Sequence, residues 1–154
     1  MSVDFRWLKQ LWEGRRLLGQ TAEFGAALPA SGTLFTIAGG RILITSIIGE
    51  ITASCDANAT AIRLQADPTT GTTVNLCTAT DIASYIAGDI LGITGIPTDP
   101  MLPATTSGAI PAQTMGVVCN IGTITMVLGA AGQVTGRVRW TLHWIPLDSG
   151  SAVS

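Results

Sequence analysis

The chain has 154 residues, a length that suits one compact domain with a substantial core. Charged residues make up only 12% of the sequence while hydrophobic residues reach 47%, and the mean hydropathy is +0.45. Such a low charge content argues against an isolated, well-solvated monomer and favours a surface that is covered by neighbouring subunits. The hydropathy does not indicate a membrane span, because the longest apolar region, residues 34–51, contains Arg41, Glu50 and the Gly39-Gly40 pair.

The N-terminal residues predict a basic arm rather than a secretory signal, because charged residues interrupt every apolar stretch. We therefore expect synthesis and assembly in a cytoplasm. Residues 4–18 carry apolar side chains at helical spacing, with charged residues largely on the opposite face. The apolar and basic residues that would contact a partner are Trp7, Leu8, Leu11, Trp12, Arg15 and Arg16.

Composition divides the chain into three parts. Half of the eight Lys and Arg residues lie in the first 16 positions, whereas most acidic residues follow later. Residues 20–33 read as an extended linker, because they contain Ala, Gly, Pro29 and Ser31-Gly32. We expect an N-terminal arm over residues 1–32, a β-domain over residues 33–147 and a C-terminal tail over residues 148–154.

From residue 33 onward the pattern predicts strands. Residues 34–38 and 41–54 flank Gly39-Gly40, which we predict to be a hairpin turn, with a bulge expected near Gly49. Residues 60–66 and 72–77 predict a hairpin around the turn at residues 67–71, and residues 114–120 and 122–128 predict a second hairpin. Thr80-Asp81 could cap one or two helical turns, and four prolines between residues 97 and 111 indicate a surface loop.

Residues 133–145 give the clearest strand, with a nearly unbroken apolar–polar alternation. Val138, Trp140, Leu142 and Trp144 share one face, and the other face carries Arg137, Arg139 and His143. We predict that this second row is either an interface with an acidic neighbour or a solvated sheet face. Together, the strands and their turn spacing predict an all-β fold, either an antiparallel β-sandwich or a jelly-roll-like barrel.

The sequence offers no plausible catalytic set, and we expect the protein not to be an enzyme. His143 is the only histidine, and it lies mid-strand between Leu142 and Trp144. The aspartates fall at turns or strand ends, where backbone hydrogen bonding explains them. Cys55, Cys77 and Cys119 lie in or beside apolar segments without C-x-x-C spacing, so we expect buried free thiols and neither a metal site nor a cofactor.

The partner of the arm has three possible chemistries. Trp7 and Trp12 could stack on nucleic-acid bases, but four cations are a weak footprint for a polyanion. A membrane-surface helix is disfavoured by its short length and by Gly14. We therefore expect a protein groove as the partner, with no nucleic acid and no membrane.

One segment carries a family resemblance: LFTIAGGRILITSIIGEITASCDANATAIRLQADPTTGTTVNLC, followed downstream by GDILGITG. It resembles small β-rich virion structural proteins of tailed bacteriophages, of the capsid decoration, cement or minor head type. The likeness covers residues 34–96, with the closing Arg-Val-Arg-Trp strand as a weaker match, and excludes the arm. It implies a homo-oligomeric virion protein that binds the major capsid protein or another virion protein through a terminal arm.

Two alternatives remain open. One is a tail, neck or fibre-base component of the same kind of particle. The other is a carbohydrate- or ligand-binding β-sandwich, which would need an exposed aromatic platform. The chain contains only eight aromatic residues, and the alternation predicts that Trp140 and Trp144 are core.

Overall fold

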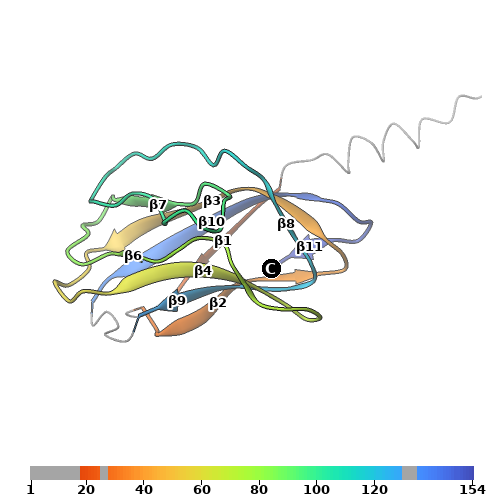
Figure 1. The fold of residues 1–154 in the computed structure, drawn as a ribbon, viewed down its shortest axis with the longest axis horizontal. Coiled ribbons are helices and arrows are strands. Elements are labelled where there is room, and N and C mark those ends of the chain that lie inside the picture. The colour runs from red at the N-terminus through yellow and green to blue at the C-terminus, as the bar shows by residue number, and fades with distance from the viewer. Residues whose placement is uncertain (1–17, 25–27, 130–134) are drawn as a thin grey trace, which may run out of the picture.

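The computed structural model describes residues 18–24, 28–129 and 135–154, and this part of the chain folds into two packed antiparallel β-sheets (Figure 1). Sheet A has the order β1-β10-β3-β7, with β8 also paired to β3. Its strands are β1 (Leu18–Glu23), β3 (Ile42–Ala53), β7 (Ile90–Gly92), β8 (Val117–Cys119) and β10 (Arg137–Pro146). No helix occurs among the described residues, so none of them forms an apolar helix that could cross a membrane.

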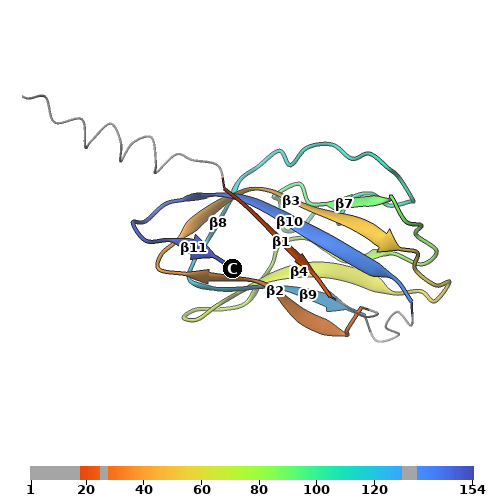
Figure 2. The same ribbon diagram turned by 180° about the vertical axis from the view of Figure 1, so that it is seen from behind.

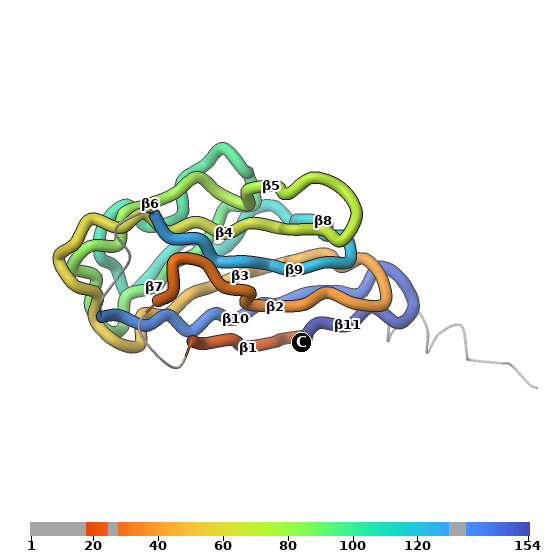
Figure 3. Tube along the Cα trace, turned by 90° about the horizontal axis from the view of Figure 1, so that it is seen from below, coloured from red at the N-terminus to blue at the C-terminus, as the bar shows by residue number. Residues whose placement is uncertain are grey.

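Sheet B has the order β11-β2-β9-β4-β5, with β6 also paired to β4 (Figure 3). Its strands are β2 (Ser31–Ala38), β4 (Ala61–Pro68), β5 (Val74–Asn75), β6 (Thr80–Asp81), β9 (Gly122–Leu128) and β11 (Ala152–Val153). The two sheets alternate along the chain, so most connections cross from one layer to the other.

The strand pairing is nested. β1 pairs with β10, β2 with β9, β3 with β8 and β4 with β5, all antiparallel. Alternate pairs fall in sheet A and sheet B, which is the arrangement of a jelly roll. The structure therefore confirms the predicted all-β fold class and identifies which of its forms the chain adopts.

The core lies between the two sheets, where alternate side chains of each strand meet. In β10, Val138, Trp140, Leu142 and Trp144 are buried, as their alternation predicts. Trp140 is fully buried and lies opposite Gly49 of β3. A Cβ atom at Gly49 would lie only 2.9 Å from Trp140 Cζ3 and from Val138 Cγ1, so glycine makes room for the indole.

The bulges of β3 differ from the prediction. The register against β10 shifts at two places, which leaves Thr45 and Thr52 as extra residues, while Gly49 stays in regular register. The Thr45 hydroxyl donates a hydrogen bond to the His143 carbonyl at 3.2 Å, beside the first shift. The glycine at position 49 thus reflects close packing under Trp140 and not a bulge.

Two predicted hairpin turns are wrong. The Gly39-Gly40 turn connects β2 in sheet B to β3 in sheet A, and residues 120–121 connect β8 in sheet A to β9 in sheet B. Both turns cross between layers, and local turn residues do not distinguish a crossing from a hairpin. The hairpin of β4 and β5 is confirmed, with Gln65 opposite Asn75 and Ala66 opposite Val74.

Three further segments differ from the sequence analysis. Residues 18–23, predicted to end a helix and begin a linker, form β1, and β2 already begins at Ser31. Thr80-Asp81 forms β6, where Asp81 Oδ1 accepts hydrogen bonds from the Thr60 and Ala83 amides. Residues 152–153, predicted as part of a tail, form β11. Pairing with a distant strand produces β1 and β11, and local composition does not show that pairing.

An exposed ion pair and a short strand pairing attach the C-terminal segment to the sandwich. Asp148 accepts hydrogen bonds from the Arg41 backbone amide at 2.8 Å, from Arg41 Nε at 2.9 Å and from Arg41 Nη2 at 2.8 Å. These contacts hold the pKa of Asp148 well below its usual range. Beyond this point, Ser154 and Thr36 exchange backbone hydrogen bonds at 2.8 and 3.1 Å, which attaches the chain end to β2.

The close packing at Gly49 gives a stability prediction. Gly49→Ala should lower the free energy of unfolding by about 1–3 kcal/mol, because the new methyl group overpacks the core against Trp140. Urea unfolding monitored by tryptophan fluorescence measures the change. Gly108→Ala is the matched control, because its Cβ would meet only the Gly88 carbonyl oxygen at 3.7 Å. Equal stability of the two variants would contradict the packing argument.

The Asp148 ion pair gives a pH prediction. Because the folded-state pKa is lowered from 3.8, the stabilisation is complete above about pH 4 and is lost as the pH falls through the folded-state value. At neutral pH, Asp148→Asn should therefore speed hydrogen exchange of the Thr36 and Ser154 amides. Asp99→Asn changes an aspartate elsewhere in the chain and should leave the exchange rates of those amides unchanged. Unaltered exchange in Asp148→Asn would show that β11 is held without the ion pair.

Candidate functional site

The outer face of sheet A carries the row that the sequence analysis proposed as a possible interface. Arg137 and Arg139 are exposed, and His143 is half-buried, all on the solvent face of β10. Arg139 forms an ion pair with Glu50 of β3, and this partner raises the pKa of the Arg139 guanidinium. His143 lies opposite Gly19 of β1. The structure thus places the three residues on one face, and their role as an interface stays a prediction.

Charged side chains of three strands meet at one end of this face. Glu23 of β1 lies opposite Arg139 and accepts a hydrogen bond from the Thr52 hydroxyl of β3. Two carboxylates and one guanidinium therefore share the end of three adjacent strands. An arginine already engaged by Glu50 contributes less to recognising an external anion. An acidic neighbour as the partner of this row stays a prediction.

The predicted arm contacts are not part of the structural description. Trp7, Leu8, Leu11, Trp12, Arg15 and Arg16 lie outside the described residues. Their role therefore remains a sequence-based expectation.

The three cysteines are free and buried, as predicted. Burial raises the pKa of the Cys55 and Cys119 thiols to about 11, and it also raises the pKa of Cys77. Among the described residues, no group of three or more His, Cys, Asp or Glu side chains could hold a metal ion. The described thiols are thus protonated core residues at neutral pH.

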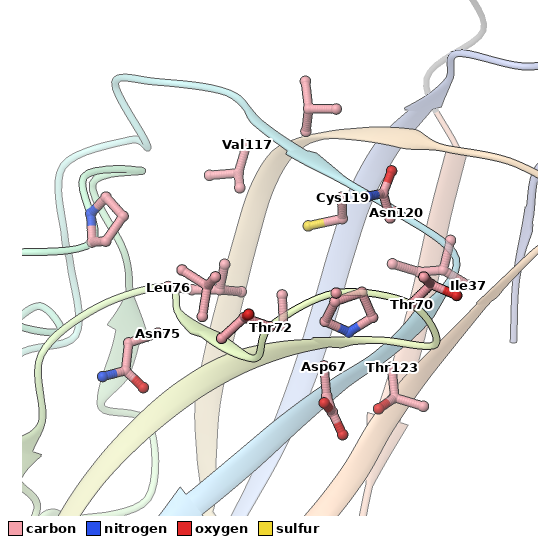
Figure 4. Close-up of a pocket in the computed structure, with 16 residues that line it drawn as sticks. Ile37, Asp67, Thr70, Thr72, Asn75, Leu76, Val117, Cys119, Asn120 and Thr123 are labelled. Carbon is pink, nitrogen blue, oxygen red and sulfur yellow. The ribbon is translucent and has the colours of Figure 1, made fainter.

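A groove opens between the β4–β5 hairpin and β8, at the side of the sandwich opposite β1 (Figure 4). Its volume is about 270 Å³. Val117 and Cys119 approach it from β8, and Leu76 approaches it from the hairpin side. Asp67 is the only charged residue in its lining, and its Oδ1 accepts a hydrogen bond from the Thr73 hydroxyl at 2.5 Å. The groove is therefore mainly apolar.

Exposed apolar side chains gather around this groove. Val74 and Val118 line it and are 51% and 60% exposed. We call these two exposed lining residues, Val74 and Val118, the apolar rim.

Sequence reasoning missed the groove and its rim. The lining comes from segments far apart in the chain, which only the crossing topology brings together. One local signal for an exposed apolar side chain was available. Val117 and Val118 are adjacent apolar residues in a strand, so their side chains must point to opposite sides of the sheet.

The aromatic residues do not form a sugar-binding platform in the described part of the chain. Trp140, Trp144, Phe35 and Tyr85 are buried, and Phe24 is half-buried. The Tyr85 hydroxyl donates a hydrogen bond to the Pro103 carbonyl at 2.8 Å. Carbohydrate recognition by stacking on an exposed aromatic face therefore has no support from these residues.

No protein-family model matches the chain, and no curated protein matches it. A chain from "Structure of infectious bursal disease virus Gx strain" is similar over 90% of this protein at 14% identity, with a TM-score of 0.27. This chain spans 38% of the length of that viral chain. A similarity this weak carries no argument about function.

The buried thiols give a reactivity prediction. With a pKa of about 11, only about one in a thousand Cys55 or Cys119 side chains is a thiolate at pH 8, and burial adds steric protection. The folded protein should therefore react with a thiol-specific chromogenic disulfide many times more slowly than the urea-unfolded chain. Mass spectrometry would identify the modified positions. Rapid labelling of a cysteine in the folded protein would contradict this prediction.

Proposed function

We propose that the protein is a virion structural protein of a tailed phage that decorates or cements the capsid exterior, with surfaces rather than an active site as its working parts. The observation that carries this proposal is the apolar rim around the groove. Exposed apolar surface on a protein marks an interaction site, and Val74 and Val118 expose such surface at the same mainly apolar groove. The N-terminal arm would supply the second contact with the capsid.

The fold is compatible with this role but does not select it. Jelly rolls occur in viral capsid domains, in lectins and in cupins, so function must come from the surface. The low charge content of 12% supports a subunit whose surface is covered in an assembly. The sequence resemblance to small phage virion proteins supports the location on a phage particle.

The alternatives have weaker support. An enzyme would need polar groups that converge on His143 or a cysteine, but His143 lies on the outer face of sheet A, and the cysteines lie in the core. A carbohydrate-binding module would need exposed aromatic residues, and the described ones are buried or half-buried. A tail, neck or fibre-base component would use the same kind of apolar surface, and its partner would be a tail protein.

Capsid binding tests the proposal. The purified protein should sediment with phage heads assembled from the major capsid protein of the same genome. Val118→Asp should weaken this binding by at least about tenfold, because it places a charge in the apolar rim. Ile86→Asp is the matched control, since Ile86 is 59% exposed but is not part of the rim.

The arm is tested in the same assay by deletion of residues 1–16, which leaves β1 intact. We expect the truncated protein to bind capsids more weakly than the full chain. Full binding by the truncated protein would remove the arm from the proposal. Failure of the unmodified chain to bind heads, together with binding to tail structures, would favour the tail alternative.

A further inference from the structure

β1 is a long strand edge that the described residues leave open along its whole length. It has six residues and pairs with β10 in an uninterrupted register from Leu18 to Glu23, and no described strand pairs with its other edge (Figure 2). Most other edge strands are short: β5, β6 and β11 have two residues each, and β7 and β8 have three. The exception is β2, since β11 pairs only with Ile37 and Ala38 on its outer edge. Short edges resist pairing with other chains, whereas a long regular edge invites it.

The sequence of β1 lacks the usual devices that protect an edge. LGQTAE contains no proline and no lysine, and its register shows no bulge. Its single charged residue, Glu23, lies at the end of the strand and is held by the Thr52 hydroxyl. On the opposite side of sheet A, a side chain occupies the gap between β7 and β8. The Gln113 side chain there accepts a hydrogen bond from the Ile47 amide at 3.2 Å.

The inner side of β1 is also incompletely covered. Leu18, Ala22 and Phe24 pack against the hydrophobic core but remain only partly buried. A neighbouring strand along this edge would extend the sheet and cover these side chains. The burial of apolar surface would add to the hydrogen bonds of a new ladder.

We propose that two copies of the chain pair antiparallel through β1, so that the two A sheets join into one continuous sheet. A second copy fits best because the edge is complementary to itself. Directly opposite residues of antiparallel strands point to the same side of the sheet, so the two-fold axis must pass through a residue and not between two residues. Centring it on Thr21 includes every described residue from Leu18 to Phe24, with Leu18 opposite Phe24 of the second copy.

This register also matches the charges. Thr21 faces Thr21 of the second copy, and Gly19 faces Glu23 of the second copy, so no like charges are opposed. Gly19, Thr21 and Glu23 are the exposed residues of β1 and form the outer side of the new interface. The inner side brings Leu18, Gln20, Ala22 and Phe24 of both copies together.

The inference deepens the proposed function, since it names one surface of the oligomer that a virion subunit would form. It can be tested on the purified full chain without any capsid. Sedimentation velocity over a range of protein concentrations should show a monomer–dimer equilibrium. Thr21→Lys should raise the dimer Kd by about tenfold or more, because two lysines would then lie directly opposite each other. Thr105→Lys adds the same charge in an exposed loop and should leave the Kd unchanged.

Introducing a negative or a positive charge at position 19 tests the register itself. A Cβ atom at Gly19 would meet His143 Cδ2 at 3.5 Å, an ordinary contact, so side chains fit there. Gly19→Glu should weaken the dimer and Gly19→Lys should tighten it, each by between about twofold and thirtyfold in Kd, because each dimer contains two contacts with Glu23. A monomer at all concentrations, or a dimer indifferent to Thr21→Lys, would overturn the proposal. Equal effects of the two Gly19 variants would overturn the Thr21-centred register.

The two proposals fail separately. A dimer that responds to the β1 variants but does not bind phage particles would support the β1 interface and contradict the virion function. Capsid binding by a chain that is a monomer in solution would do the reverse.

Discussion

The structure depends on β10, the central strand of sheet A, because one face of it must fill the space between the two sheets. Val138, Trp140, Leu142 and Trp144 supply that face. Once Trp140 occupies the interior, its neighbour on β3 must be Gly49, since even a methyl group there would approach the indole too closely. The same alternation turns Arg139 and His143 outward and sets the register of β1, so core and surface have one common origin.

Strands that carry their own local pattern were predictable from the sequence. The alternation of β10 and the turn of the β4–β5 hairpin are local signals, and the structure confirms both. The buried state of Cys77 and Cys119 also follows from the apolar residues before them, Leu76 and Val118. Strands whose pairing partner is distant in the sequence were not predicted correctly. β1 has no strong alternation of its own, and its place in the sheet comes from pairing with β10 at the other end of the chain.

The functional surface was harder to foresee for the same reason. A turn at Gly39-Gly40 or at residues 120–121 appears identical in sequence whether the chain returns to the same sheet or crosses to the other one. Because the chain crosses, β8 comes to lie beside the β4–β5 hairpin, and the groove forms between them. Neither segment alone predicts a groove. The row of Arg137, Arg139 and His143 was predictable from β10, but the engagement of Arg139 by Glu50 was not.

The two proposed interaction sites lie on opposite sides of the sandwich, and this separation has a consequence for assembly. β1 ends sheet A on one side, whereas β8 and the groove lie on the other. Pairing through β1 would therefore leave both grooves of a dimer accessible, with their apolar rims facing away from the two-fold axis. A dimer with two such sites would bind a repetitive surface more tightly than either site alone, because the second contact forms at a high effective concentration.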